Sequence, residues 1–96
     1  MSLKDALSLK NKVVEIDGVT VNLRRPSLAD LAMAIEMSEK SSNFTAWLVF
    51  NHVMEDGKQY FQSEDDVLKC DGFFVEKIAN EIDLLYGEGR DLPRQQ

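Results

Sequence analysis

The sequence has very few of the residues that build disulfides, metal sites and catalytic sites, with one cysteine and one histidine among 96 residues. Cys70 alone cannot form an internal disulfide, and no group of cysteine and histidine residues has the spacing of metal ligands. We therefore expect no metal and no cofactor, and a reducing compartment such as the cytoplasm.

Long apolar runs and an excess of positive charge are also lacking. No stretch approaches the roughly 20 apolar residues that span a bilayer, and the first residues lack the continuous apolar core of a signal peptide. Seventeen acidic and eleven basic residues give a formal net charge of −6. Such a surface repels nucleic-acid phosphates and anionic lipids, so neither nucleic acid nor membrane is an expected partner.

The length and composition suit one small folded domain. Hydrophobic residues make up 44% of the chain and charged residues 29%, which is enough for one modest core. Residues 1–11 are too few to form a stable helix alone, and residues 88–96 have little to bury. We expect a flexible arm at 1–11, one globular domain at 12–87 and a mobile tail at 88–96.

Residues 12–24 have the pattern of a β-hairpin. Apolar and polar side chains alternate around Asp17-Gly18, a dipeptide that accepts the positive φ angles of a type I′ turn. The resulting register pairs Ile16 with Val19 on an apolar face. Because two strands alone are marginally stable in water, that face must rest on helices or on another chain. This is the single hairpin that the sequence predicts.

Two further segments have the periodicity of amphipathic helices. Ser27 can cap a helix that runs to about residue 40, and Gly87 is expected to end a last helix over residues 73–86. The apolar stripe of the first is Leu28, Leu31, Ala32 and Ile35, widened by Met33, Ala34 and Met37. The inward face of the last is Phe74, Val75, Ile78, Ala79, Ile82, Leu85 and Tyr86.

A third helix, predicted over residues 43–55, is apolar nearly all round. It carries more apolar surface than a 96-residue monomer can cover, so we expect self-association. The candidate protein-binding residues are Phe50, Met54, Trp47 and Met37. Trp47 fits a core position better, whereas Phe50 and Met54 suit core and interface equally. The predicted fold is α+β and mainly α, with an N-terminal β-hairpin packed on about three helices.

Catalysis has only a weak basis in the residues. His52 and Cys70 could act as base and nucleophile, but a hairpin with three short helices offers little of the cleft that catalysis needs. Asp56-Gly57 could begin a calcium loop, yet the alternating ligands and closing glutamate are missing. The acidic run Glu64–Asp66 is typical of a solvated helix start. We therefore expect no catalytic residues and no enzyme activity.

The order of these elements resembles the tail assembly chaperones of long-tailed (siphovirus-type) bacteriophages. The corresponding features are a strand pair ending at Arg24-Arg25, a helix start at Ser27, a D-G-x-x-x-F element from Asp56 to Phe61, and a closing helix ending in Leu-Leu-Tyr-Gly. The similarity covers residues 12–87.

This resemblance implies a mostly helical protein that binds the tape measure protein, prevents its aggregation and helps recruit tail tube subunits during tail morphogenesis. It also implies a homo-oligomer that acts in the host cytoplasm and is absent from the mature virion, and a longer form made by ribosomal frameshifting. The alternative is a small non-catalytic adaptor or antitoxin-like module that binds one basic partner stoichiometrically. The chaperone, by contrast, requires self-association or binding to a long helical client.

Overall fold

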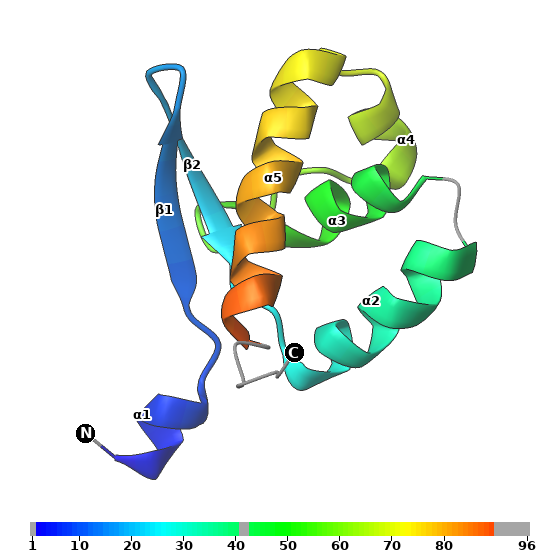
Figure 1. Ribbon diagram of the computed structural model, residues 1–96. Helices are drawn as coiled ribbons and strands as arrows, with labels where there is room; N and C mark the ends of the chain where they lie inside the picture. The colour runs from blue at the N-terminus through cyan, green and yellow to red at the C-terminus, as the bar shows by residue number, and fades with distance from the viewer. Residues whose placement is uncertain (1, 41–42, 90–96) are drawn as a thin grey trace.

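The chain folds into a hairpin on one side of a long helix and a group of shorter helices on the other side (Figure 1). The structure is a computed structural model that describes residues 2–40 and 43–89. The elements follow in the order α1 (Leu3–Leu7), β1 (Asn11–Ile16), β2 (Val19–Arg24), α2 (Leu28–Lys40), α3 (Phe44–His52), β3 (Val53–Glu55), β4 (Lys58–Gln59), α4 (Glu64–Leu68) and α5 (Gly72–Gly89). Helices predominate, so the predicted α+β, mainly α, fold class is confirmed.

The predicted hairpin is present with the predicted register. β1 and β2 are antiparallel and pair Ile16 with Val19, as the two-residue turn requires. Asp17 and Gly18 have φ angles of 52° and 82°, which only a turn with two left-handed residues uses. Ile16 and Val21 are buried whereas Val13 is exposed, so one face of the hairpin rests on the helices.

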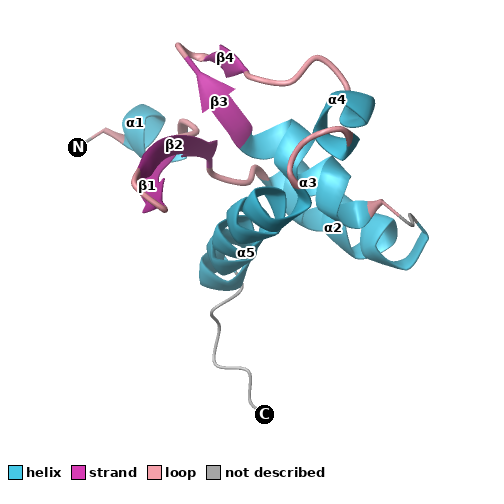
Figure 2. Cartoon of the chain, turned by 90° about the horizontal axis from the view of Figure 1, so that it is seen from above, coloured by secondary structure: helices cyan, strands magenta, loops and turns pink. Residues whose placement is uncertain are grey.

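A second hairpin corrects the predicted helix over residues 43–55. The helix ends at His52, and β3 pairs with β2 through Leu23 opposite Val53. Asp56 and Gly57, at φ angles of 55° and 79°, form another two-residue turn into β4. The expectation of a single hairpin is therefore wrong, because the open edge of β2 recruits a third strand that local helical spacing does not reveal. The four-stranded sheet has the order β1-β2-β3-β4 (Figure 2).

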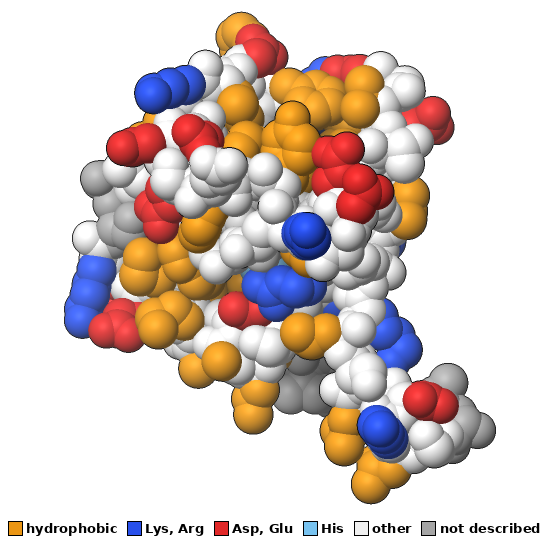
Figure 3. Space-filling model, turned by 180° about the vertical axis from the view of Figure 1, so that it is seen from behind, with side chains coloured by type: hydrophobic (Ala, Val, Ile, Leu, Met, Phe, Trp, Pro, Cys, Tyr) orange, Lys and Arg blue, Asp and Glu red, His pale blue; other side chains and the backbone are white. Residues whose placement is uncertain are grey.

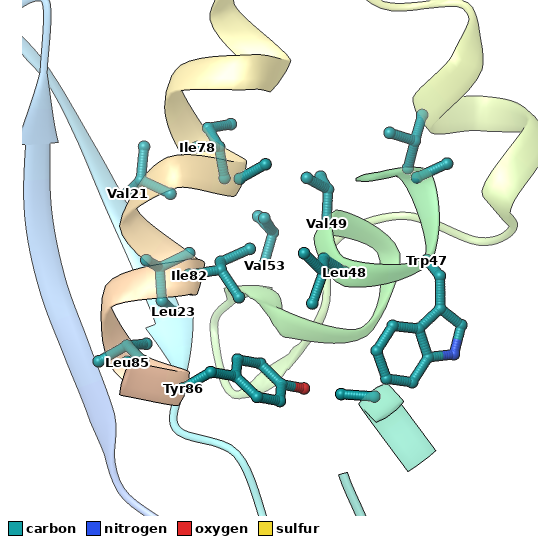
Figure 4. Packing of buried hydrophobic residues seen from close by; sticks show 14 of the residues in the cluster. Val21, Leu23, Trp47, Leu48, Val49, Val53, Ile78, Ile82, Leu85 and Tyr86 are labelled. Atoms are coloured by element: carbon teal, nitrogen blue, oxygen red, sulfur yellow. The ribbon is translucent and has the colours of Figure 1, made fainter. Parts of the chain in front are cut away.

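The core lies between the sheet, α3 and α5. Figure 4 shows Leu23 of β2 and Ile82 of α5 next to Val53 and Leu48. The predicted inward face of α5 is confirmed, with its central and final residues buried and its first residues partly buried against the core. These residues are Ile78, Ala79, Ile82, Leu85 and Tyr86, followed in degree of burial by Phe74 and Val75.

The apolar stripe predicted on α2 is wrong in its phase. Ala34 is the buried residue of this helix, with Leu31 and Met37 partly buried on either side at a spacing of three. Leu28 and Ile35, which the stripe included, are 82% and 58% exposed. Apolar residues occupy several sides of this helix, so periodicity alone does not show which side faces the core. The side that does carries Ala34, whose small side chain allows close packing.

Both ends of the chain depart from expectation in detail. Residues 3–7 of the predicted arm form the short helix α1, and β1 begins at Asn11, one residue before the predicted domain boundary. At the other end α5 continues through Gly87 to Gly89 instead of ending there. The predicted mobile tail therefore overlaps the end of α5, and from residue 90 onward it lies outside the described residues.

Arg24 and His52 form a junction where β2, α2 and α3 meet. The Arg24 guanidinium donates to the Asp30 carboxylate at 2.7 Å and to the Asn51 carbonyl oxygen at 2.9 Å. Asp30 in turn accepts the Ser27 backbone N–H at 2.9 Å, and Ser27 Oγ accepts that of Asp30 at 3.1 Å. This reciprocal cap begins α2 as predicted, and Arg24 ties it to the end of α3.

His52 is the one fully buried polar residue in the described part of the chain. Its Nδ1 lies 2.8 Å from the Arg24 carbonyl oxygen and its Nε2 lies 2.7 Å from the Tyr86 hydroxyl. Because a carbonyl only accepts, Nδ1 carries the proton and donates, so the neutral ring can accept from Tyr86 at Nε2. The ring thus joins β2 and α3 to α5 without a buried unpaired nitrogen.

The surroundings keep this ring neutral. Burial, the strongest influence, lowers the pKa of His52 from its ordinary value of 6.5, and the hydrogen bond to Arg24 does not offset it. Burial would raise the pKa of Asp30, but hydrogen bonds from Ser27 and Arg24 outweigh it, and the net pKa is lowered from 3.8. Both groups therefore stabilise the fold in the state that they adopt at neutral pH.

The lowered pKa of His52 predicts a loss of stability in mild acid. The unfolded chain binds the histidine proton below pH 6.5 while the folded chain resists it, so the free energy of unfolding falls as the pH drops from 6.5. The limiting slope is about 1.4 kcal/mol per pH unit. Urea unfolding of the untagged protein at several pH values between about 7.5 and 5 measures this slope. The His52→Gln variant should lack the slope. An NMR midpoint for this single histidine at or above 6.5 would contradict the burial.

Candidate protein-binding site

An apolar groove of about 790 Å³ lies between the sheet, the segment after β4 and the start of α5. Val19 to Asn22 of β2 and Val53 to Glu55 of β3 form one wall. Its larger apolar side chains are Met54, Tyr60, Phe61, Phe74, Val75 and Ile78. An open apolar groove of this size in so small a domain is a candidate site for a protein ligand.

Local hydrogen bonds place the aromatic residues around this groove. The Tyr60 backbone N–H donates to the Val53 carbonyl oxygen at 3.0 Å, which holds the chain beside β3 after the turn. Tyr60 and Phe61 are in edge-to-face contact, with ring centroids 4.9 Å apart. On the opposite side the Asp71 carboxylate accepts the Phe74 N–H at 3.0 Å and caps α5, so that Phe74 lies at its first turn.

The charges of the groove have one sign. Glu55 and Asp71 line it, and no lysine, arginine or histidine among the described residues does. Hydrophobic side chains gather beside acidic ones on the face of the molecule that Figure 3 shows. Because both carboxylates are exposed, they contribute less to affinity than the apolar walls do, and they favour a ligand whose apolar face is flanked by basic residues.

The structure does not bring the four predicted protein-binding residues into one surface. Met54 lines the groove from β3. Phe50 is half-buried at the end of α3, where its carbonyl oxygen accepts from the Gln59 side chain at 2.9 Å. Met37 is half-buried on α2, and Trp47 belongs to the core at 9% exposure, stacked on Phe44.

Sequence reasoning missed most of the groove. Tyr60, Phe61 and Phe74 line it, although no pattern in the sequence places these three residues together. The available signal was the second Asp-Gly pair at residues 56–57, which repeats the turn chemistry of the first hairpin. A two-residue turn at Asp56-Gly57 implies a strand on each side of it, which places Met54 in a strand and brings it close to Tyr60.

His52 and Cys70, which were considered as a base and a nucleophile, lie in separate places. His52 is enclosed, with its ring nitrogens bonded to Arg24 and Tyr86, whereas Cys70 is exposed beside the groove. Within residues 2–40 and 43–89, no three or more histidine, cysteine, aspartate or glutamate residues are grouped to hold a metal ion. None of the helices described is both long and apolar enough to cross a membrane.

Comparisons of the chain with protein-family models, with curated proteins and with solved structures found no match. The function therefore has to be inferred from the physical properties of the chain itself. Its most distinctive surface is the groove, which joins apolar walls to two carboxylates. These properties suit the binding of an amphipathic protein segment.

Strand pairing at residues 53–55 predicts unequal losses of stability for two neighbouring substitutions. Val53 is 7% exposed and faces the core, so Val53→Ala should lower the free energy of unfolding by about 1–3 kcal/mol. Met54 is half-buried at the groove, and Met54→Ala should cost less than about 1 kcal/mol. Urea unfolding of the two variants provides the measurement, and a larger cost for Met54→Ala would contradict the described register.

Proposed function

We propose that this protein is a phage tail assembly chaperone that binds the tape measure protein through the groove lined by Met54. It prevents aggregation of that protein and helps recruit tail tube subunits around it. The observation that carries the proposal is the open apolar groove in a small, acidic chain. An amphipathic helix of the client would place its apolar side chains in this groove.

Exposed apolar residues around the groove also support the proposal that a client binds there. Tyr60 at its edge is 57% exposed, and Phe73, next to the groove residue Phe74, is 84% exposed. Apolar area of this kind can cover the apolar stripe of a long helix, which would otherwise aggregate. The formal charge of −6 keeps the complex dispersed, because like-charged complexes repel each other.

The resemblance in the order of elements supports the choice of client. The features that carry it are Arg24-Arg25, the helix start at Ser27 and the element from Asp56 to Phe61. In the structure Arg24 and Ser27 meet at the junction, and Phe61 lines the groove. In this proposal the protein acts in the host cytoplasm, forms a homo-oligomer, and is absent from the mature virion.

An adaptor or antitoxin-like module is the second candidate. The observation that favours it is the pair of carboxylates Glu55 and Asp71 in the groove, which would suit a small basic partner. Such a partner would bind stoichiometrically and with strong salt dependence, since exposed charges are screened within about 10 Å at ordinary ionic strength. A chaperone would instead bind mainly through apolar contact, and salt would change its affinity little.

Co-expression with the tape measure protein tests the chaperone proposal. Met54→Asp should lower the soluble fraction of that client about tenfold or more, because a carboxylate in the groove loses its hydration on binding. Leu28→Asp is the matched control, since Leu28 is 82% exposed on α2 and does not line the groove. It should preserve wild-type solubilisation, and circular dichroism of both variants checks that the fold is retained.

A third variant separates the two candidates. Glu55→Gln with Asp71→Asn, which neutralises the two carboxylates of the groove, should change the salt dependence of client binding and leave solubilisation intact. If this variant lost the client while Met54→Asp kept it, the apolar mechanism would be wrong. An electrostatic adaptor would then replace the chaperone.

A further inference from the structure

The N-terminal arm, which we define as residues 2–10, presents three leucines to solvent. Leu3 and Leu7 are each 74% exposed and Leu9 is 53% exposed, and no residue of α1 is buried. Local bonds shape the arm, because Ser2 caps the helix and the Lys10 ammonium donates to the Asp5 carbonyl oxygen at 2.6 Å. A five-residue helix is unstable on such bonds alone, so its leucines need an apolar partner surface.

The charge of the arm is opposite to that of the remaining chain. The arm contains two lysines and one aspartate, a formal side-chain charge of +1, whereas residues 11–96 contain nine basic and sixteen acidic residues, a formal charge of −7. The arm thus combines exposed leucines with Lys4 and Lys10. The groove combines apolar walls with Glu55 and Asp71, so the two surfaces are complementary in both respects.

The arm of one chain points away from the groove of the same chain. α1 precedes β1, whereas Val19 and Thr20, at the far end of the groove, directly follow the turn; the groove extends from there to Asn22, which pairs with Val13. The two ends of a six-residue strand are about 20 Å apart. Figure 1 shows α1 standing off the body, beyond the end of the hairpin opposite the turn. The arm of a second copy is not held at this distance from the groove and can reach it.

We infer that, before a client binds, the arm of a second copy docks in the groove. Leu3 and Leu7 lie against the apolar walls, and Lys4 lies among the carboxylates. The client and the arm then offer the groove the same chemistry, an apolar stripe flanked by basic residues, and they compete for it. This competition rests on the proposed function, whereas the contact between two copies does not need it.

Sedimentation of the purified chain tests the contact. At high micromolar concentration the wild type should have at least twice the mass of one 10.9 kDa chain. The arm variant, with Leu3→Ser and Leu7→Ser, should have the mass of one chain. The matched control carries Leu28→Ser and Ile35→Ser, which remove two exposed apolar residues of α2, and it should keep the wild-type mass. A monomeric wild type, or an arm variant of wild-type mass, would overturn the inference.

Cross-linking locates the contact, because native Cys70 is exposed and lines the groove. Protein carrying Leu7→Cys and Cys70→Ser is mixed with wild type and oxidised, so a disulfide between positions 7 and 70 can form only between two chains. Mass spectrometry should find this disulfide well above the level given by Leu28→Cys in the same Cys70→Ser background. Equal levels of disulfide from the Leu7→Cys and Leu28→Cys proteins would overturn the inference. A protein with Leu7→Cys and native Cys70 that forms this disulfide only within one chain would overturn it as well.

Client co-expression keeps this inference separate from the proposed function. If the arm variant becomes monomeric and the wild type fails to solubilise the tape measure protein, the contact stands and the proposed function fails. If the wild type solubilises the client and the arm variant keeps the wild-type mass, the proposed function stands and the contact fails. Competition itself predicts that the monomeric arm variant solubilises at least as much client as the wild type does.

Discussion

The enclosed ring of His52 is the interaction on which the rest of the fold depends. It ends α3, and its two nitrogens are bonded to the Arg24 carbonyl of β2 and the Tyr86 hydroxyl of α5. A buried nitrogen without a partner would cost about 1–3 kcal/mol, so the three elements are held in one arrangement. The next residue, Val53, then begins the strand that pairs with β2, and this strand forms a wall of the groove.

Arg24 extends the same constraint to α2. Few apolar residues of this helix are buried, yet its first turn is tied to β2 and α3 through Asp30 and the Asn51 carbonyl. The Arg24 side chain is 20% exposed, and a partly exposed guanidinium with two partners of this kind holds orientation better than it adds stability. The helix therefore keeps its place while Leu28 and Ile35 stay in solvent. Apolar side chains of α2 are left uncovered because this helix is positioned by the polar junction and not by burial of a large apolar face.

Local chemistry determined which parts of this structure the sequence could predict. The turn at Asp17-Gly18 and the inward face of α5 follow from residues close together in the chain, and both are confirmed. β3 was missed because Val53 and Met54 continue an apolar run of helical spacing, and only the open edge of β2 makes them a strand. The groove draws on distant segments, so Met54 was named as a binding residue for its place on a helix that ends at His52.

The central claim is that a client binds at the groove through apolar contact. Hydrogen–deuterium exchange of the chain, free and bound to a tape measure segment, tests it most directly, because exchange reports each backbone segment separately. The account predicts slower exchange in the bound state at residues 53–61 and at the start of α5, with little change in α2. Slower exchange confined to the acidic helix α4, with the groove segments unchanged, would contradict it.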